Sequence, residues 1–250
     1  MKVSIITATY NSSNSIKRTL DSIASQHYNN IEHIIIDGGS TDDTLEIVKK
    51  HQNQIAKIIS EKDNGIYDAL NKGIKIATGE IIGFLNSDDY FNSKHSVSLI
   101  VDAFEKNNAD IVYGNLLYTS DANGKSKTIR YWKSNEFDPK SIFWGWMPPH
   151  PTVYCKKEIY LTYGAYNQKF KIAADYDFIL RVFKLSNLTK THIPKVLVNM
   201  QIGGASNGSL KNIIIKTAED YKAIKSNKCG GLMCLAFKNI RKLKQFFTKY

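Results

Sequence analysis

Residues 3–11 read VSIITATYN, a short apolar strand that ends in hydroxyl, aromatic and amide side chains. Two further segments repeat this arrangement: residues 31–40 read IEHIIIDGGS, and residues 81–89 read IIGFLNSDD. A short apolar run is typical of a strand buried on both faces of a parallel sheet. Because ligands of open parallel sheets bind beyond the carboxyl ends of the strands, we expect the three polar ends to meet at one rim.

Helix signals lie between these strands. Cap residues followed by apolar side chains at helical spacing predict helices at residues 12–24, from residues 40–43 onward, at 66–77 and at 96–104. Residues 55–60 form a weaker strand. This alternation predicts an α/β, Rossmann-like fold with a mostly parallel sheet and helices on both faces.

The chain changes character after residue 113. Asn123-Gly124 is a typical hairpin turn with aromatic residues on both sides. Helical spacing returns at residues 176–183, and residues 189–200 read as a strand that Pro194 interrupts. Two C-terminal helices follow, at residues 209–226 and 232–248.

We predict one catalytic domain over residues 1–205, because 250 residues suit a single large α/β domain. Its donor half covers about residues 1–113 and its acceptor half about residues 114–205. Residues 206–250 form a basic helical extension.

Most of the net charge of +11 belongs to this extension. Residues 205–250 carry +8, whereas residues 1–204 carry only +3. This distribution argues against a nucleic-acid groove along the whole protein, and it suits a local anionic partner such as a membrane surface.

The last predicted helix has the pattern of an in-plane membrane anchor. One face carries apolar side chains, and the other carries mostly basic ones: Ala236, Ile240, Leu243 and Phe247 against Lys238, Arg241, Lys242, Gln245 and Lys249. The alternative is a helix whose apolar side packs on the catalytic domain.

Cysteine usage and the N-terminus indicate a cytoplasmic protein. The three cysteines are odd in number and include no C-x-x-C pair, so we expect neither disulfides nor a zinc site. Residues 1–7 run directly into a strand without the pattern of a signal peptide. No apolar run approaches the ~18 residues of a membrane span, so any attachment to the inner face of the cell membrane would be peripheral.

The adjacent carboxylates of Asp88 and Asp89 are the sharpest chemical feature. Two neighbouring acids at the end of a buried strand repel each other and call for a compensating cation. Hard divalent ions such as Mn²⁺ or Mg²⁺ take oxygen ligands and bridge to diphosphates. An isolated Asp-Asp would more simply be a polar turn with a helix cap. The predicted neighbourhood of Asp37 and residues 7–11 favours the metal site.

Four other polar residues each have two interpretations. Asp37 could accept hydrogen bonds from a nucleobase or ribose, or bond to local backbone before two glycines. Asp63 could line a phosphate site or cap the following helix. Asn71 and Lys72 could contact the donor or lie on the solvated face of that helix.

The order and spacing of six strings resemble family 2 glycosyltransferases: VSIITATYN (3–11), IDGGSTD (36–42), NSDD (86–89), PHPT (149–152), GAYN (164–167) and ADYD (174–177). The resemblance covers about residues 1–205, and it implies an inverting, nucleotide-sugar-dependent enzyme of the GT-A fold. DNGIYDALNKG at residues 63–73 is similar to the subset that builds bacterial exopolysaccharide, O-antigen and capsule chains.

The resemblance also implies roles for individual residues. It places Thr7, Thr9, Tyr10 and Asn11 in a nucleoside pocket, with Asp37 on the base. Asp88 would face the ribose or sugar, Asp89 would bind the metal, and Asp175 would be the catalytic base.

Two departures from the family matter. Many members carry a second acid where this chain has Gly38, which bears on the base contact. The Q-x-x-R-W signature of processive synthases has no match, which favours a single transfer over polymerisation.

The acceptor side is less defined by sequence. Asp175 could be a plain N-cap of the helix that follows it, and Asp177 is the obvious substitute base. His150, among three prolines, could line the acceptor site, help hold the diphosphate, or be structural.

These observations predict metal-dependent, inverting transfer of a single sugar from a nucleoside diphosphate sugar, most simply a UDP-sugar, to a hydroxyl. The acceptor would be a saccharide or a lipid-linked saccharide of a cell-surface polysaccharide. Two alternatives remain at this stage: a nucleotidyltransferase acting on sugar phosphates, and a non-catalytic saccharide-binding protein. No G-x-G-x-x-G follows any strand, which excludes a dehydrogenase.

Overall fold

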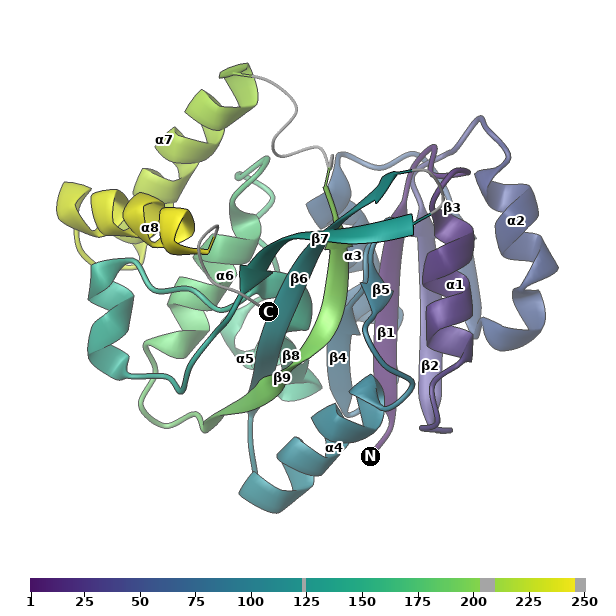
Figure 1. The fold of residues 1–250 in the computed structure, drawn as a ribbon, viewed down its shortest axis with the longest axis horizontal. Helices are drawn as coiled ribbons and strands as arrows, with labels where there is room; N and C mark the ends of the chain where they lie inside the picture. The colour runs from purple at the N-terminus through teal and green to yellow at the C-terminus, as the bar shows by residue number, and fades with distance from the viewer. Residues whose placement is uncertain (123–124, 203–209, 246–250) are drawn as a thin grey trace.

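The computed structural model describes residues 1–122, 125–202 and 210–245 (Figure 1). A central sheet has the strand order β3-β2-β1-β4-β8-β6-β9-β5, and β7 pairs with β6 outside this path. The strands are β1 (Val3–Thr9), β2 (Ile31–Asp37), β3 (Lys57–Ser60), β4 (Ile81–Phe84), β5 (Tyr90–Phe91), β6 (Ile111–Ala122), β7 (Lys125–Trp132), β8 (Tyr154–Lys156) and β9 (Lys190–Gln201).

Eight α-helices and three short 3₁₀ helices are described around this sheet. The α-helices are α1 (Ile16–Ala24), α2 (Thr44–Lys50), α3 (Ile66–Ile76), α4 (Ser96–Asn107), α5 (Lys157–Tyr163), α6 (Ala174–Phe183), α7 (Leu210–Ser226) and α8 (Leu232–Lys244). The 3₁₀ helices are η1 (Gln52–Gln54), η2 (Pro139–Trp144) and η3 (His150–Thr152).

The sheet is mixed. Strands β3, β2, β1 and β4 are mutually parallel, as predicted for the donor half. β8 runs antiparallel to both β4 and β6, and β5 and β7 are also antiparallel to their neighbours. The prediction of a mostly parallel sheet is therefore wrong for the acceptor half, where most strand pairs are antiparallel. Strands β5 and β8 were not predicted, because strands of two or three residues show no recognisable periodicity.

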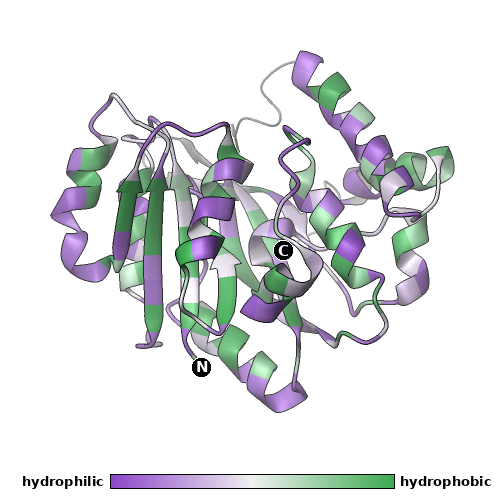
Figure 2. Cartoon of the chain, turned by 180° about the vertical axis from the view of Figure 1, so that it is seen from behind, coloured by the Kyte–Doolittle hydropathy of each residue, from purple (hydrophilic) through white to green (hydrophobic). Residues whose placement is uncertain are grey.

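Helices cover both faces of the sheet, as expected. Successive residues of β1 point to opposite sides: Ile6 packs with α3, α5 and α6, whereas Ile5 packs with α4 and the end of α1. Ile35 of β2 packs with α1 and α2 on the same side as Ile5. In Figure 2 the longest green stretches belong to the strands, whereas the helices alternate between purple and green.

Two local predictions for the second half are confirmed. β6 and β7 form the expected antiparallel hairpin, although its turn at residues 123–124 lies outside the described residues. Between Tyr113 and Asn115 the pairing register shifts against β9, from His192 to Val196. Pro194 lies within this bulge, where it has no ladder bond to donate.

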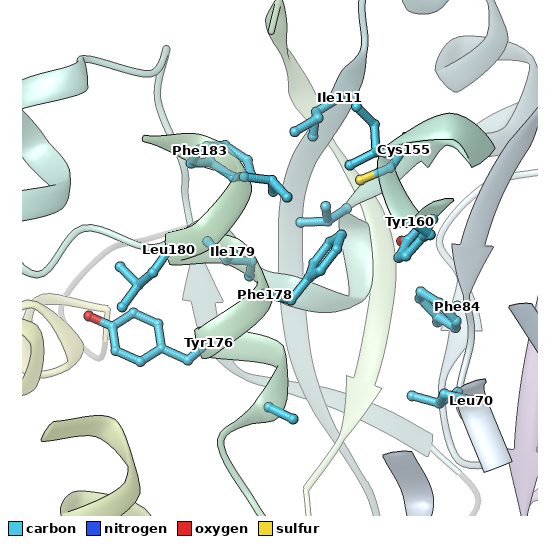
Figure 3. Packing of buried hydrophobic residues seen from close by; sticks show 14 of the residues in the cluster. Leu70, Phe84, Ile111, Cys155, Tyr160, Tyr176, Phe178, Ile179, Leu180 and Phe183 are labelled. Carbon is cyan, nitrogen blue, oxygen red and sulfur yellow. The ribbon is translucent and has the colours of Figure 1, made fainter. Parts of the chain in front are cut away.

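The C-terminal helices share the main core. Ala223 and Ile224 of α7 and Cys234 of α8 belong to the same buried cluster as Phe178 of α6. Figure 3 shows Phe178 directed toward the strands and Tyr176 directed toward α8. All three cysteines are buried and free.

The orientation of α8 corrects the predicted amphipathic arrangement. Lys238, expected on the solvated face, is 5% exposed, pairs with Asp220 at 2.5 Å, and lies 3.6 Å from the centre of the Tyr176 ring. Ile240, expected on the packing or lipid face, is half exposed. The reason is that Lys238 neutralises a buried acid and stacks on an aromatic ring, a pairing that sequence spacing does not reveal. The side chains of Leu243, Phe247 and Lys249 lie outside the described residues.

Candidate functional site

The three polar strand ends meet at one rim, as predicted. Asn11, after β1, accepts a hydrogen bond from the backbone of Thr41 at 2.9 Å, which joins it to the loop after β2. The hydroxyls of Ser12 and Ser87 lie 2.8 Å apart, which joins the loops after β1 and β4. Asn11 adopts a left-handed backbone conformation with φ of 47°, a conformation that asparagine tolerates better than most residues.

The residues predicted for the nucleoside pocket differ in exposure. Tyr10 is 62% exposed and presents its ring at the rim, where it could stack on a base. The Thr9 hydroxyl is buried and has no hydrogen-bond partner among the described residues. Thr7 is fully buried, and its hydroxyl lies 3.1 Å from Nε2 of His33 on β2. Its side chain therefore links β1 to β2 inside the sheet and is not exposed at the rim.

Asp37 organises its own turn. Its carboxylate accepts hydrogen bonds from the backbone of Gly39 at 3.1 Å, from the backbone and hydroxyl of Ser40, and from the Ser60 hydroxyl at 2.7 Å. The side chain is fully buried. This geometry favours the local-backbone interpretation of Asp37, which would shape the base pocket.

Asp63 takes the space beside Gly38. A Cβ atom at Gly38 would lie 2.5 Å from Asp63 Oδ2, so no side chain fits there without moving that carboxylate. Asp63 also accepts a hydrogen bond from the Gly65 backbone at 2.9 Å. The acid beside position 38 in this chain therefore comes from the next loop.

Asn71 and Lys72 both use their polar side-chain atoms in contacts within the chain. Asn71 donates to the Tyr166 carbonyl at 2.8 Å and accepts from the Tyr166 backbone at 3.0 Å, which ties α3 to the loop after α5. Lys72 pairs with Glu61 at 2.8 Å and with Asp68 at 3.3 Å. These contacts favour the structural interpretation of both residues, and we leave them out of the proposed site.

Asp88, which is half-buried, and Asp89, which is fully buried, form an acidic pair. Burial raises the pKa of Asp88, although Arg18 on α1 partly opposes this. Burial, and then the neighbouring Asp88, raise the pKa of Asp89 well above its ordinary value. Asp89 is fully buried; its carboxylate accepts a hydrogen bond from the Asn86 amide at 3.3 Å and is also stabilised by the Gln201 backbone.

The structure of this pair fits a divalent cation. Asp89 Oδ1 is buried and has no hydrogen-bond partner within the described residues, as expected of an oxygen reserved for a metal. In the described part of the chain no three His, Cys, Asp or Glu side chains cluster as metal ligands. A cation on Asp89 would thus complete its shell with water and with diphosphate oxygens, as Mg²⁺ commonly does.

The predicted base, Asp175, begins α6 at the opposite side of the site. His150 Nδ1 lies 3.3 Å from Asp175 Oδ2, so the structure brings these two predicted residues together. The Tyr67 hydroxyl lies 3.1 Å from Asp175 Oδ1 and 2.7 Å from the Ile172 carbonyl, and it can donate to one of them at a time.

Asp175 is ionised at neutral pH. Burial alone would raise its pKa, but His150, Lys216 and Lys238 more than offset this, and the pKa of Asp175 falls below its ordinary value. Burial lowers the pKa of His150, although Asp175 opposes the shift. The arrangement is therefore an ionised carboxylate beside a neutral imidazole, which is a competent proton acceptor.

Asp177 has a structural role. It is 5% exposed, pairs with Arg181 at 2.9 Å, and accepts a hydrogen bond from the Asn227 amide at 2.7 Å. These contacts join α6 to the segment between α7 and α8, so the structure does not favour Asp177 as a substitute base.

Three residues of the site were missed from the sequence. Arg18 influences both acids of the Asp88-Asp89 pair and lies over the ring of Tyr90, 4.2 Å from its centre. Tyr118 stands between the two halves: burial raises its pKa, and both Asp89 and Asp175 raise it further. The Arg130 guanidinium lies 3.7 Å from the centre of the Tyr118 ring. Nothing in the local sequence distinguishes these residues from ordinary helix and strand positions.

Comparisons with known proteins identify the family. The sequence matches glycosyl transferase family 2 over residues 4–170. A PGL/p-HBAD biosynthesis glycosyltransferase of Mycobacterium bovis is 30% identical over 210 residues, which are 82% of this chain and 78% of that protein. A chondroitin synthase of Pasteurella multocida is 32% identical over 217 residues, which are 84% of this chain but only 22% of that longer enzyme.

Solved structures of low sequence identity share the fold. S. aureus TarS 1–349 in complex with UDP-GlcNAc superposes with a TM-score of 0.70 at 20% identity, over 91% of this chain and 65% of that one. The mannosyltransferase PcManGT from Pyrobaculum calidifontis, in complex with GDP-Man and Mn²⁺, gives a TM-score of 0.64 at 17% identity, over 100% of this chain and 76% of that one. The predicted GT-A fold is confirmed, with a mixed sheet. The chain belongs to glycosyl transferase family 2 and is a glycosyltransferase.

Proposed function

We propose that this glycosyltransferase moves a single sugar from a nucleoside diphosphate sugar to a hydroxyl acceptor, with inversion at the anomeric carbon. The donor is a UDP-sugar, and the acceptor is a saccharide or a lipid-linked saccharide of a cell-surface polysaccharide. One observation carries the proposal. The Tyr67 hydroxyl, on the helix that follows the donor-side loop of Asp63, lies 3.1 Å from Asp175 Oδ1, so the donor-side loops and the candidate base meet.

The donor side would hold the nucleotide at the rim of β1, β2 and β4. Tyr10 offers its exposed ring to the base, and Asp63 and the Asp37 turn shape the pocket beneath it. Asp88 faces the ribose or sugar. Arg18 adds the positive charge that a diphosphate requires near two acids.

Asp89 would hold Mn²⁺ or Mg²⁺ through its unpartnered oxygen. Such a cation, when bound, would supply charge neutralisation to the departing diphosphate. The solved mannosyltransferase with GDP-Man and Mn²⁺ supports this choice of cofactor by similarity of fold.

Asp175 would act on the acceptor. The acceptor oxygen forms a bond to the anomeric carbon while its proton passes to the Asp175 carboxylate. The bond from that carbon to the diphosphate breaks, and the electron pair leaves with the diphosphate. Attack from the face opposite the leaving group inverts the configuration. His150 Nδ1, 3.3 Å from Asp175 Oδ2, keeps the carboxylate oriented.

A donor panel tests this proposal. Purified protein is incubated with UDP-, GDP- and dTDP-sugars, and slow donor hydrolysis is measured with Mn²⁺ and with excess chelator. We expect hydrolysis of a UDP-sugar in Mn²⁺ and little in chelator. Hydrolysis that is unaffected by chelator would contradict the metal role, and a preference for another nucleotide would contradict the choice of donor.

We also propose that α8 attaches the enzyme to an anionic membrane through its outward face. Leu232, Met233 and Ile240 are 69%, 66% and 50% exposed, and together with Ala236 they follow the spacing of one helical face. The basic charge of residues 205–250 favours an anionic surface, at about 1 kcal/mol for each Lys or Arg close to it. None of the described helices is long and apolar enough to cross a bilayer.

Point variants test attachment without disturbing the core. The double variant Leu232→Asp/Met233→Asp should lose co-sedimentation with phosphatidylglycerol vesicles at low salt, because both side chains are largely exposed. The matched control Leu161→Asp changes an equally exposed leucine, 70% exposed, on α5. Equal vesicle binding by the double variant and the wild type would overturn the attachment, and so would no binding by either.

A further inference from the structure

A small cavity lies beneath α8, on the acceptor side of the molecule. Its volume is about 170 Å³, and its walls come from the end of β7, from residues 145–147 and from α8. Trp146 and Asn135 line it on one side, and Lys238, Arg241, Lys242 and Gln245 line it on the other. We refer to it as the α8 cavity.

Positive charge in and around the α8 cavity exceeds the negative charge. Lys238 is balanced by Asp220. Lys242 and the neighbouring Lys216 of α7 form no ion pair with any described carboxylate. Burial, and then Lys216 and Lys238, lower the pKa of Lys242 to about 8. Clustered cations in a partly buried site are destabilised by mutual repulsion, and an anion would relieve it.

A polar oxygen in the same cavity is also unpartnered. The side-chain oxygen of Gln245 is buried and accepts no hydrogen bond from the described residues. A hydroxyl group beside a bound anion would satisfy it. A bound group with a negative charge would balance the cations, and a hydroxyl on it would donate to the Gln245 oxygen. A phosphorylated sugar carries both groups.

The α8 cavity adjoins the predicted base. Lys238 stacks on Tyr176, the residue after Asp175. Lys216 and Lys238 both contribute to the lowered pKa of Asp175. An acceptor with its anionic group in the cavity would thus have its sugar hydroxyls near the carboxylate that takes the proton.

We propose that the α8 cavity binds the phosphate or diphosphate group of the acceptor through Arg241 and Lys242, which line it. Ammonium and guanidinium groups are the usual protein partners of phosphate. The volume equals that of about five or six water molecules, which suits one or two phosphate groups and excludes a polysaccharide chain. The assignment rests on the proposed function, because it names the chemical class of the acceptor.

Calorimetry with inorganic pyrophosphate tests the site without catalysis. Titrations use full-length protein at low salt in excess chelator, so that no metal recruits pyrophosphate to Asp89. We expect Lys242→Gln to bind pyrophosphate about tenfold more weakly than the wild type, and Arg241→Gln/Lys242→Gln more weakly still. Lys242→Arg keeps the charge and should retain most of the binding. Lys225→Gln removes an exposed lysine of α7 and should leave binding unchanged.

Several outcomes would overturn the assignment. Equal pyrophosphate affinity in the wild type and the double variant would place the site elsewhere, and no binding by the wild type would remove it. Co-sedimentation of the same variants with phosphatidylglycerol vesicles is a second measurement. If the double variant loses vesicle binding and pyrophosphate does not bind, the cavity recognises a lipid headgroup instead of the acceptor.

Donor hydrolysis separates this assignment from the proposed function. A wild-type protein that hydrolyses a nucleotide sugar but does not bind pyrophosphate overturns the α8 cavity alone. A protein that binds pyrophosphate at Lys242 but hydrolyses no donor contradicts the proposed function and leaves the anion site in place.

Discussion

Asp175 contacts the His150 imidazole and the Tyr67 phenol, and these contacts fix the position of a carboxylate that is ionised at neutral pH. We expect Asp175→Asn to lower kcat by about 10²–10⁴, because the amide cannot accept the proton, while the KM for the donor changes little. Steady-state kinetics with saturating acceptor measure both parameters. Asp177→Asn is the comparison: its contacts with Arg181 and Asn227 predict a lower melting temperature with a smaller change in kcat. Wild-type turnover by Asp175→Asn would place the base elsewhere.

Asp89 is a buried carboxylate, and one of its oxygens has no hydrogen-bond partner among the described residues. We expect Asp89→Ala to lose nearly all transfer activity and to bind nucleoside diphosphates more weakly in Mn²⁺, because the diphosphate loses its bridging cation. Calorimetry with UDP, with and without Mn²⁺, gives the metal-dependent part of the affinity. Asp102→Ala changes an exposed acid on α4 and serves as the control. Full turnover by Asp89→Ala in excess chelator would rule out the metal role.

Glu32 shows how a charged side chain can stabilise an otherwise apolar strand. It is 4% exposed, and the hydroxyls of Ser4 and Thr78, the Thr78 backbone and the Lys2 ammonium all donate to it. Burial alone would raise its pKa, but these hydrogen bonds lower the pKa of Glu32 to about 2. A lowered carboxylate pKa stabilises the fold above the ordinary value of 4.5, and this stability is lost as the pH falls toward 2.

We therefore expect Glu32→Gln to reduce the free energy of unfolding by about 3 kcal/mol at pH 7, and by much less near pH 2. Urea unfolding at pH 7, 4 and 2.5 measures the difference. Glu46→Gln, on the exposed face of α2, should cost little at any of these values. A Glu32→Gln cost that is constant with pH would show that lost packing, and not the ionised carboxylate, is responsible.

At the scale of elements, α7 fixes the start of α6. Glu219 accepts hydrogen bonds from the backbone of Lys171 at 2.8 Å, Ile172 at 2.8 Å and Ala173 at 3.0 Å, so one carboxylate holds the three residues before α6. Asp175 follows this clamped segment directly. We expect Glu219→Ala to lower kcat about tenfold or more with a smaller change in donor KM, because small displacements of a catalytic group are costly.

Glu219→Gln separates positioning from general loss of stability. The amide keeps one accepting oxygen, so its kcat should fall between those of the wild type and Glu219→Ala, and thermal melting should show the same order. Glu158→Ala, an exposed acid on α5, is the matched control. If Glu219→Ala lowers the melting temperature but leaves kcat unchanged at a temperature where it is folded, the clamp is structural only.

An element can be predicted from sequence when its own residues carry the pattern that specifies it. Strands β1, β2 and β4, their polar ends and the hairpin of β6 and β7 were predictable, because apolar runs and turn residues are local features. Strand β8 and the inward face of α8 were not, since each depends on a distant partner. Lys238 reads as a solvated residue until Asp220 and Tyr176 are placed beside it.

The same distinction applies to the candidate site. Asp88, Asp89 and Asp175 follow recognisable strings, whereas Arg18 and Tyr118 enter the site only because α1 and β6 pass beside it. Asn71 lies in a string that resembles the family, yet its amide bonds the backbone of Tyr166. A sequence string shows which residue types are present, and only tertiary packing shows which of their polar atoms remain available.

At the scale of the whole molecule, the donor and acceptor halves share one sheet, and the C-terminal helices share its core. Strand β6 connects the halves, because it pairs with β9 on one side and with β8 on the other, and β8 pairs in turn with β4. The boundary predicted near residue 205 therefore divides the sequence without dividing the hydrophobic core. Cys234 of α8 belongs to the same buried cluster as Ile6 of β1.

This shared core predicts that α8 cannot be removed without cost. A chain that ends after Gly230 would leave Asp220, 2% exposed, without Lys238, and it would uncover Tyr176 beside the base. Loss of one partner of a buried ion pair costs about 3–5 kcal/mol, so the melting temperature should fall by at least about 6 °C.

Lys238→Ala should reproduce most of this loss, whereas Lys225→Ala, which changes an exposed lysine of α7, should not. We also expect kcat to fall, because Lys238 packs on Tyr176, the residue after Asp175, and its loss loosens the start of α6. Differential scanning calorimetry and steady-state kinetics measure both effects. A shortened chain with the melting temperature and kcat of the full chain would show that α8 is an appendage of the catalytic domain.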